Sequence, residues 1–106
     1  VVWDRRFWHR NGLDQCIADF STSRVPDLNI MDAYNVMLRN GPMGVSTKDV
    51  ANMKSLLISP NMVTMDTAGA KMFGMEPDTI DYIVKAQSMG IGSMDLSSQR
   101  IKRLTV

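Results

Sequence analysis

The sequence predicts an α/β fold, a small parallel or mixed sheet with helices packed on it, in a fragment of a larger α/β domain. Three observations predict it. Residues 28–36 alternate with the period of two that is typical of a strand. The run "MKSLLIS" at 53–59 is continuously apolar, and segments with helical periodicity lie before and after these two strands. Strands separated by helices are typical of α/β architecture with right-handed crossovers.

The first predicted element is a helix that begins after Asn11, its expected N-cap. Its apolar face follows the i, i+3, i+4, i+7 spacing. The residues of this face are Leu13, Cys16, Ile17 and Phe20. We therefore expect this face to point into the core, where the Cys16 thiol would be unreactive.

The second predicted element is the strand at 28–36, which Pro26 introduces by favouring extended geometry. It ends before a turn signal at Asn40-Gly41-Pro42. Ser46 or Thr47 is then expected to cap a short helical turn through about residue 52. The apolar run at 53–59 is typical of a strand that is buried on both faces of a parallel sheet.

Two helices and a weaker strand complete the chain. Ser59-Pro60 combines an N-cap residue with proline at the first helical position, so a helix is expected from there to Gly74. Its Met62–Phe73 face is expected to pack on the strand at 54–59. Pro77 begins a second helix, Gly90 ends it, and "QRIKRLTV" at 99–106 is predicted to be the last strand.

Two carboxylates interrupt these apolar patterns. Asp32 stands in the middle of the strand face that carries Ile30 and Tyr34, and Asp66 lies near the centre of the apolar arc of the helix. An unpartnered buried carboxylate is costly, so each needs partners or must bind a proton. Two interpretations are open. Either each accepts backbone N–H bonds, with the loop at 40–44 as a donor to Asp32, or both converge near that loop on one polar site at the sheet edge.

Composition and charge exclude several function classes. Twelve basic and eleven acidic residues give a net charge of +1, which gives no support to a nucleic-acid partner. No run approaches the ~18 apolar residues of a membrane span. The sole cysteine, Cys16, excludes an internal disulfide and an all-cysteine cluster built from this chain alone. His9 is the only histidine and is expected to be structural.

Two longer segments carry a resemblance: "LNIMDAYNVMLRNGPMG" at 28–44 and "LLISPNMVTMDTAGAKMFGMEPDTIDYIVKAQSMGIG" at 56–92. They resemble the C-terminal half of the domain-of-unknown-function family 362, over roughly residues 9–104. The matching positions are Asp32, Asn40, Gly41, Pro42, Gly44, Ser59, Asp66, Gly74 and Gly90-Ile91-Gly92.

The resemblance implies that residues 1–106 are one α/β domain or part of one, whose partner is the upstream part of the same polypeptide. Many members carry a ferredoxin-like CxxCxxCxxxCP segment, and some bear twin-arginine export signals. We therefore expect part of an iron-sulfur-associated redox protein, with a redox partner, no cofactor in this chain and the cluster outside it. We expect the protein either to be cytoplasmic or to be exported by a twin-arginine signal that lies outside this chain.

The alternative is an α/β domain without a cluster that binds a small ligand or a metal. Its expected ligand-binding residues are Asp32, Asn40, Gly41, Ser59 and Asp66. The resemblance implies no reaction, so whether the protein is an enzyme stays open.

Overall fold

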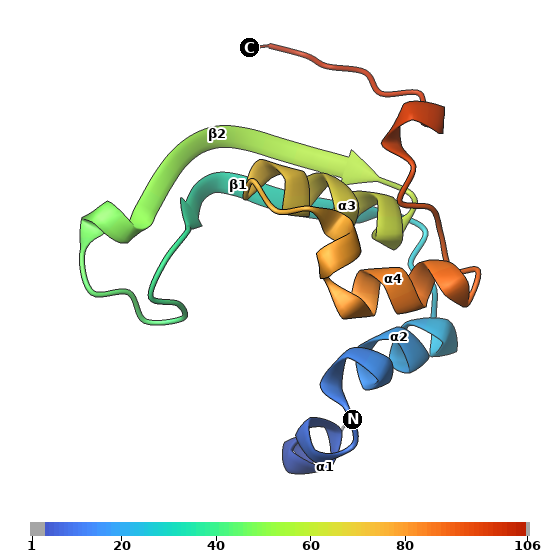
Figure 1. The fold of residues 1–106 in the computed structure, drawn as a ribbon. Helices are drawn as coiled ribbons and strands as arrows, with labels where there is room; N and C mark the ends of the chain where they lie inside the picture. Colours follow the sequence, from blue (N-terminus) through green and yellow to red (C-terminus); the bar gives the residue numbers. More distant parts are fainter. Residues whose placement is uncertain (1–3, 106) are drawn as a thin grey trace.

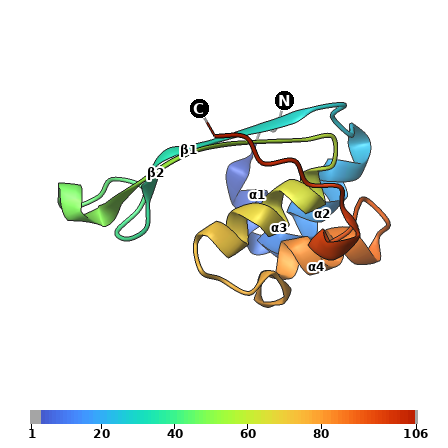
Figure 2. The ribbon, with the colours of Figure 1, turned by 90° about the horizontal axis from the view of Figure 1, so that it is seen from above.

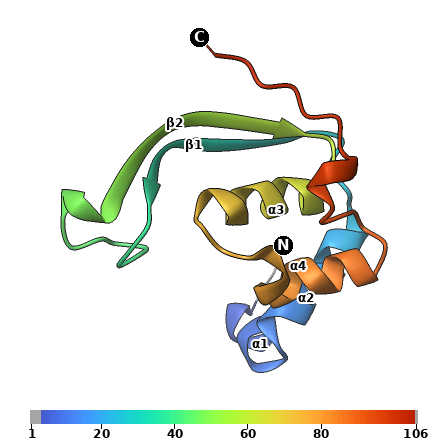
Figure 3. The same cartoon turned by 45° about the horizontal axis from the view of Figure 1, so that its top comes forward.

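The computed structural model describes residues 4–105. A two-stranded hairpin lies above a stack of helices, with α3 directly beneath it, then α4, then α2, and α1 at the far end (Figures 1 and 3). Short 3-10 turns lie at Thr47–Asp49, Pro77–Thr79 and Leu96–Ser98. The main elements are α1 (Arg5–Arg10), α2 (Leu13–Ser23), β1 (Asn29–Met37), β2 (Val50–Ser59), α3 (Met62–Met72) and α4 (Asp81–Ser88).

The two strands pair antiparallel, so the expected parallel or mixed sheet is wrong for the part of the chain that the structure describes. Ile30 lies opposite Ile58, and Asp32 lies opposite Leu56. A parallel pair needs a long crossover connection. Residues 38–49 instead form a loop with one short 3-10 turn, which returns the chain alongside β1. β2 is also longer than predicted, because it begins at Val50 where a helical turn was expected.

One face of the hairpin packs on α3. Ala33 is buried on this face, and the Met31 thioether lies over Gly69 so closely that a Cβ added there would sit 2.9 Å from the Met31 methyl. The predicted packing of this helix on the strand at 54–59 is confirmed, since α3 contacts β2, and α3 contacts β1 as well. The predicted helix face is only partly right, because Phe73 is exposed while Thr67 is fully buried. The Thr67 hydroxyl donates to the Val63 carbonyl at 2.7 Å, which satisfies it within the helix.

The core lies between the helices rather than under the sheet. Ile83 of α4 is only 1% exposed and is the largest apolar side chain that is fully buried in the described residues. Small residues let the three helices approach one another closely. The core cluster comprises Ala18 of α2, Val63 and Ala70 of α3, and Ile83 and Ala86 of α4.

The helix ends follow the sequence signals in part. Gly74 and Gly90 have φ angles of 71° and 76°, as predicted for glycines that end helices. Pro77 begins a 3-10 turn, and α4 itself starts only at Asp81. Asn11 does not cap α2; its side chain turns back and donates to the Phe7 carbonyl at 2.7 Å, at the end of α1.

The C-terminal segment differs from the prediction. Residues 99–105 form no strand, and 100–105 are exposed. The segment leaves the 3-10 turn at Leu96–Ser98 and runs back beyond the edge of the hairpin that β2 forms (Figures 1 and 2). None of the helices in residues 4–105 has the length and apolar character required to cross a membrane.

Candidate functional site

Asp32 lies on the exposed face of the hairpin. Side chains alternate along a strand, so Asp32 points away from the face on which Met31 and Ala33 meet α3. Its Oδ1 accepts a hydrogen bond from the Tyr34 backbone N–H at 2.9 Å. The predicted burial of Asp32 is therefore wrong, and its backbone donor comes from its own strand rather than from the 40–44 loop.

Asp66 lies on the helix side of the sheet, half-buried beside Tyr82 of α4. Burial raises the pKa of Asp66, and a hydrogen bond from the Tyr82 side chain lowers it by less. Burial, the charge of Asp66, the hydrogen bond to it and the charge of Asp14 raise the pKa of Tyr82 to about 12. Tyr82 thus keeps its proton at neutral pH and ties α4 to α3.

The structure does not bring Asp32 and Asp66 together. The sheet separates them, because Asp32 faces outward from β1 while Asp66 meets Tyr82 among the helices. Within residues 4–105, no three His, Cys, Asp or Glu side chains gather closely enough to hold a metal ion. The two carboxylates therefore lie on different sides of the sheet.

The loop that contains Asn40 and Gly41 is organised by a different carboxylate, Asp49. Asn40 has a φ of 55°, and its Nδ2 donates to Asp49 Oδ1 at 2.9 Å. Asp49 Oδ2 accepts from the backbone N–H groups of Val45 at 2.7 Å and Ser46 at 3.0 Å. These hydrogen bonds lower the pKa of Asp49, and the bond from the Val45 N–H has the largest effect.

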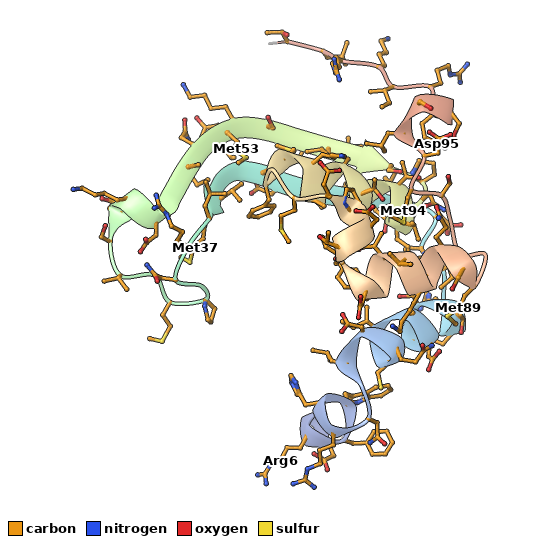
Figure 4. All side chains as sticks on the ribbon, in the orientation of Figure 1. Arg6, Met37, Met53, Met89, Met94 and Asp95 are labelled. Carbon is orange, nitrogen blue, oxygen red and sulfur yellow. The ribbon has the colours of Figure 1, made fainter. Side chains whose placement is uncertain are left out.

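A sequence signal for Asp49 exists, but it lies outside the apolar patterns that predicted the helices and strands. Ser46-Thr47-Lys48-Asp49 has the S-x-x-D spacing of a capping box, and both of its reciprocal bonds are formed. Met37 supports the same loop, since a Cβ added to Gly44 would lie 3.1 Å from the Met37 methyl (Figure 4). The loop is therefore a built structure at the tip of the hairpin.

Ser59 belongs to a polar network at the start of α3. Its hydroxyl donates to the Asn61 carbonyl at 2.9 Å and accepts from the Asn61 N–H at 3.1 Å. Asn61 caps α3 by accepting from the Thr64 N–H at 2.9 Å, and its Nδ2 donates to the Ile91 carbonyl at 3.0 Å. Gly92 packs on the Asn61 side chain with no room for a Cβ. The network joins β2, α3 and the segment after α4.

An open apolar groove of about 510 Å³ lies between α1 and α2. Trp8 and Phe20 meet in it edge to face, with ring centroids 6.3 Å apart. The residues that line it are Trp8, His9, Leu13, Cys16, Ile17, Phe20 and Ser21. The apolar face predicted for α2 thus exists. Cys16 is buried as expected, but Leu13, Ile17 and Phe20 stay partly or largely exposed.

The comparisons with known proteins identify a family. The family model described as "Domain of unknown function (DUF362)" matches residues 1–71, which include Asp32, Asn40, Gly41, Ser59 and Asp66. No curated protein matches the chain, and no solved structure does. The match covers more than half of the sequence and confirms the family, over residues 1–71 rather than over the 9–104 of the resemblance. The chain therefore belongs to the DUF362 family of domains of unknown function.

Proposed function

We propose that this chain is the scaffold part of a larger DUF362 domain in an iron-sulfur-associated redox protein whose cluster is bound outside these residues. In this proposal the chain is the C-terminal half of the domain, and the upstream part of the same polypeptide covers the groove between α1 and α2. The observation that carries the proposal is that the apolar face of α2, with Leu13, Ile17 and Phe20, stays exposed while the helix packs on α4 through Ala18.

The inner side of α2 meets α4 through Ala18, which is fully buried in the core cluster. The other side carries Leu13, Ile17 and Phe20, and the Phe20 side chain is 60% exposed. An exposed apolar face of this kind marks an interaction surface. This pattern supports a second layer of protein over the groove. The upstream part of the same polypeptide would supply that layer.

The cysteine content supports a cluster held elsewhere. Iron–sulfur clusters are bound by several Cys thiolates. The sequence has a single cysteine, Cys16, which is buried on α2. Family members that carry a ferredoxin-like segment would supply the thiolates from that segment, and a redox partner would exchange electrons with it.

The alternative, a small-ligand or metal site built from Asp32 and Asp66, gains no support from the geometry. The two carboxylates point to different sides of the sheet.

Anaerobic purification of the full-length parent protein beside this 106-residue chain tests the proposal. We expect the parent to be brown and to contain iron and acid-labile sulfide, and the chain to be colourless. An iron-free parent, or stoichiometric iron in the isolated chain, would contradict the redox assignment.

Hydrogen exchange of the same two proteins tests the scaffold assignment separately. Backbone amides of α2 should exchange more slowly in the parent than in the isolated chain, because the covering layer would protect them. The amides of α4, which are already packed in the core, provide the internal control. Equal exchange of α2 in the two proteins would show that nothing covers the groove.

A further inference from the structure

Two asparagines of the chain are followed directly by glycine, in Asn11-Gly12 and Asn40-Gly41, and both asparagines are exposed. The backbone nitrogen of the residue after an asparagine can attack the carbon of the side-chain amide. Glycine in that position makes the attack easiest, because it has no Cβ that would crowd the ring being formed. An Asn-Gly pair is therefore open to spontaneous deamidation, and the structure around each pair decides whether the reaction proceeds.

At Asn40-Gly41 the attacking nitrogen is free, but the amide is held. Within residues 4–105 no hydrogen bond engages the Gly41 N–H. The Asn40 side chain instead reaches across the hairpin tip, with its Nδ2 2.9 Å from Asp49 Oδ1. The Asn40 carbonyl accepts from the Gly44 N–H at 2.8 Å, which fixes the peptide group that joins Asn40 to Gly41. Ring closure turns both the side chain and this peptide group, so both hydrogen bonds must break first.

The acceptor of the Asn40 amide is itself firmly placed. Asp49 Oδ2 accepts from the backbone N–H groups of Val45 and Ser46. The Asp49 N–H donates to the Ser46 carbonyl at 3.0 Å, and the Asp49 carbonyl accepts from the Leu38 N–H at 2.8 Å. Asp49 therefore stays in place when the Asn40 side chain turns toward Gly41, and the closed loop opposes the reaction.

We propose that Asn40 is a deamidation site that the closed tip loop keeps unreactive, and that its conversion follows opening of the loop. The Gly41 nitrogen then attacks Asn40 Cγ and forms a succinimide ring. The Cγ–Nδ2 bond breaks, and ammonia leaves with the proton of the Gly41 nitrogen. Water next adds to either carbonyl of the ring and opens it to aspartate or isoaspartate. The reaction consumes water and needs no oxidant, reductant or cofactor.

The product prevents the loop from closing again. An aspartate at position 40 places a carboxylate where the amide donor stood, facing the carboxylate of Asp49. Like charges that share a site disfavour each other. Isoaspartate has the same charge and also adds a methylene group to the main chain. The conversion is therefore a one-way change that holds the hairpin tip open.

Peptide mapping by mass spectrometry tests the site in the intact chain. The chain is incubated at mildly alkaline pH, which favours deprotonation of the attacking nitrogen, and is then digested in acid, which stops the reaction. We expect Asn40 to react at least about five-fold more slowly in the folded chain than in guanidinium chloride, the factor that corresponds to one hydrogen bond. Equal rates would overturn the protection, and no conversion of Asn40 in the denatured chain would overturn the site.

Asp49→Ala removes the acceptor of the Asn40 amide and tests what holds it. The Asn40 rate should rise by about five-fold or more toward the rate in the denatured chain. Asn11 in the same molecule is the control, because its Nδ2 donates to the Phe7 carbonyl at 2.7 Å, at the end of α1 rather than at the hairpin tip. Its rate should not change. An unchanged Asn40 rate, or a rise that Asn11 shares equally, would overturn the role of Asp49.

Asn40→Asp reproduces the aspartate product, and Asn40→Gly is its matched control. Both lose the donor to Asp49, but the glycine variant adds no charge and accepts the φ of 55° at this position without strain. We expect Asn40→Asp to have the lower Tm at neutral pH, because only this variant sets two carboxylates against each other. A Tm equal to or above that of Asn40→Gly would overturn the claim that the product holds the loop open.

Discussion

Asp49 and Asn40 are joined by a hydrogen bond of 2.9 Å from Asn40 Nδ2 to Asp49 Oδ1, which spans the loop at the hairpin tip. The second oxygen of the same carboxylate holds the backbone of Val45 and Ser46. One buried acidic side chain therefore organises the loop that the sequence marks by its Asn-Gly-Pro turn. The loop geometry depends on both oxygens of this group being acceptors.

Asp49→Asn is expected to lower the Tm at neutral pH, because it places an NH₂ donor where N–H groups already point. The effect should depend on pH. The pKa of Asp49 is lower in the folded state than its ordinary value of 3.8. Its contribution to stability is therefore present above 3.8 and is lost as the pH falls through the folded pKa. Thermal melts across this range should show the two proteins converging in acid.

The control for this prediction is Asp78→Asn, which removes the same charge from an exposed turn. Its Tm should stay close to that of the unchanged protein at every pH. If the Tm of Asp49→Asn stays equally far below that of the unchanged protein at the lowest pH, the charge of the carboxylate is not the cause of the difference.

Asp66→Asn is expected to act in the opposite direction and raise the Tm at neutral pH. Burial raises the pKa of Asp66, so keeping it ionised in the folded state costs stability. That cost is absent below 3.8, grows as the pH rises toward the folded pKa, and is complete above it. The gain from Asp66→Asn should therefore appear only as the pH rises. Melting curves of both proteins from acid to neutral pH measure it.

Tyr82→Phe is the companion variant. It removes the hydrogen bond that favours the ionised carboxylate, so it should raise the pKa of Asp66 further and lower the Tm at neutral pH. An Asp66→Asn protein that melts lower than the unchanged protein at neutral pH would mean that Tyr82 and other donors outweigh the burial.

Gly69 should tolerate alanine and reject leucine. A Cβ at this position would lie 2.9 Å from the Met31 methyl and 3.1 Å from its sulfur, the mobile end of a flexible side chain. Gly69→Ala also gains helix propensity of up to ~1 kcal/mol, so its net effect should be within about 1 kcal/mol of zero. Gly69→Leu overpacks the contact between α3 and the sheet and should cost ~1–3 kcal/mol. Urea unfolding measures both.

The double variant Met31→Ala with Gly69→Leu identifies the cause. If the two side chains compete for the same space, the double variant should be more stable than the sum of the single effects predicts. If the changes in the free energy of unfolding of the two single variants simply add in the double variant, the destabilisation by Gly69→Leu does not come from a clash with Met31.

Asn61→Ala should destabilise the protein by about 1–2 kcal/mol, because it removes the cap of α3. It also leaves the Ile91 carbonyl without its donor. Asn61→Asp keeps the oxygen that caps α3 but loses the donor to the Ile91 carbonyl. Its free energy of unfolding should therefore lie between that of the unchanged protein and that of Asn61→Ala. Gly92→Ala, which displaces the Asn61 side chain, should resemble Asn61→Ala. Denaturant titration of the four proteins gives this ranking, and an Asn61→Asp protein as unstable as Asn61→Ala would contradict it.

The sequence determined the elements that depend on local signals. The period of two located β1, the apolar run located most of β2, and Gly74 marked the end of α3, because these signals act through the conformations of neighbouring residues. The start of α3 was predicted two residues early, since Asn61 rather than Ser59 is its N-cap. The motif residues were also sufficient to identify the family, which the match over residues 1–71 confirms. The capping box at Ser46 and Asp49 was equally readable, although it stood outside the pattern of apolar faces.

Only the tertiary structure decided what each face meets. β1 has apolar residues on both faces, and α3 selected the one with Met31 and Ala33 because Gly69 allows a close approach there. Asp32 was thereby turned outward, away from Asp66. In the same way, Ala18 rather than Phe20 became the buried side of α2. Periodicity states which side chains share a face. The direction of a strand and the surface that covers each face depend on contacts between segments far apart in the chain.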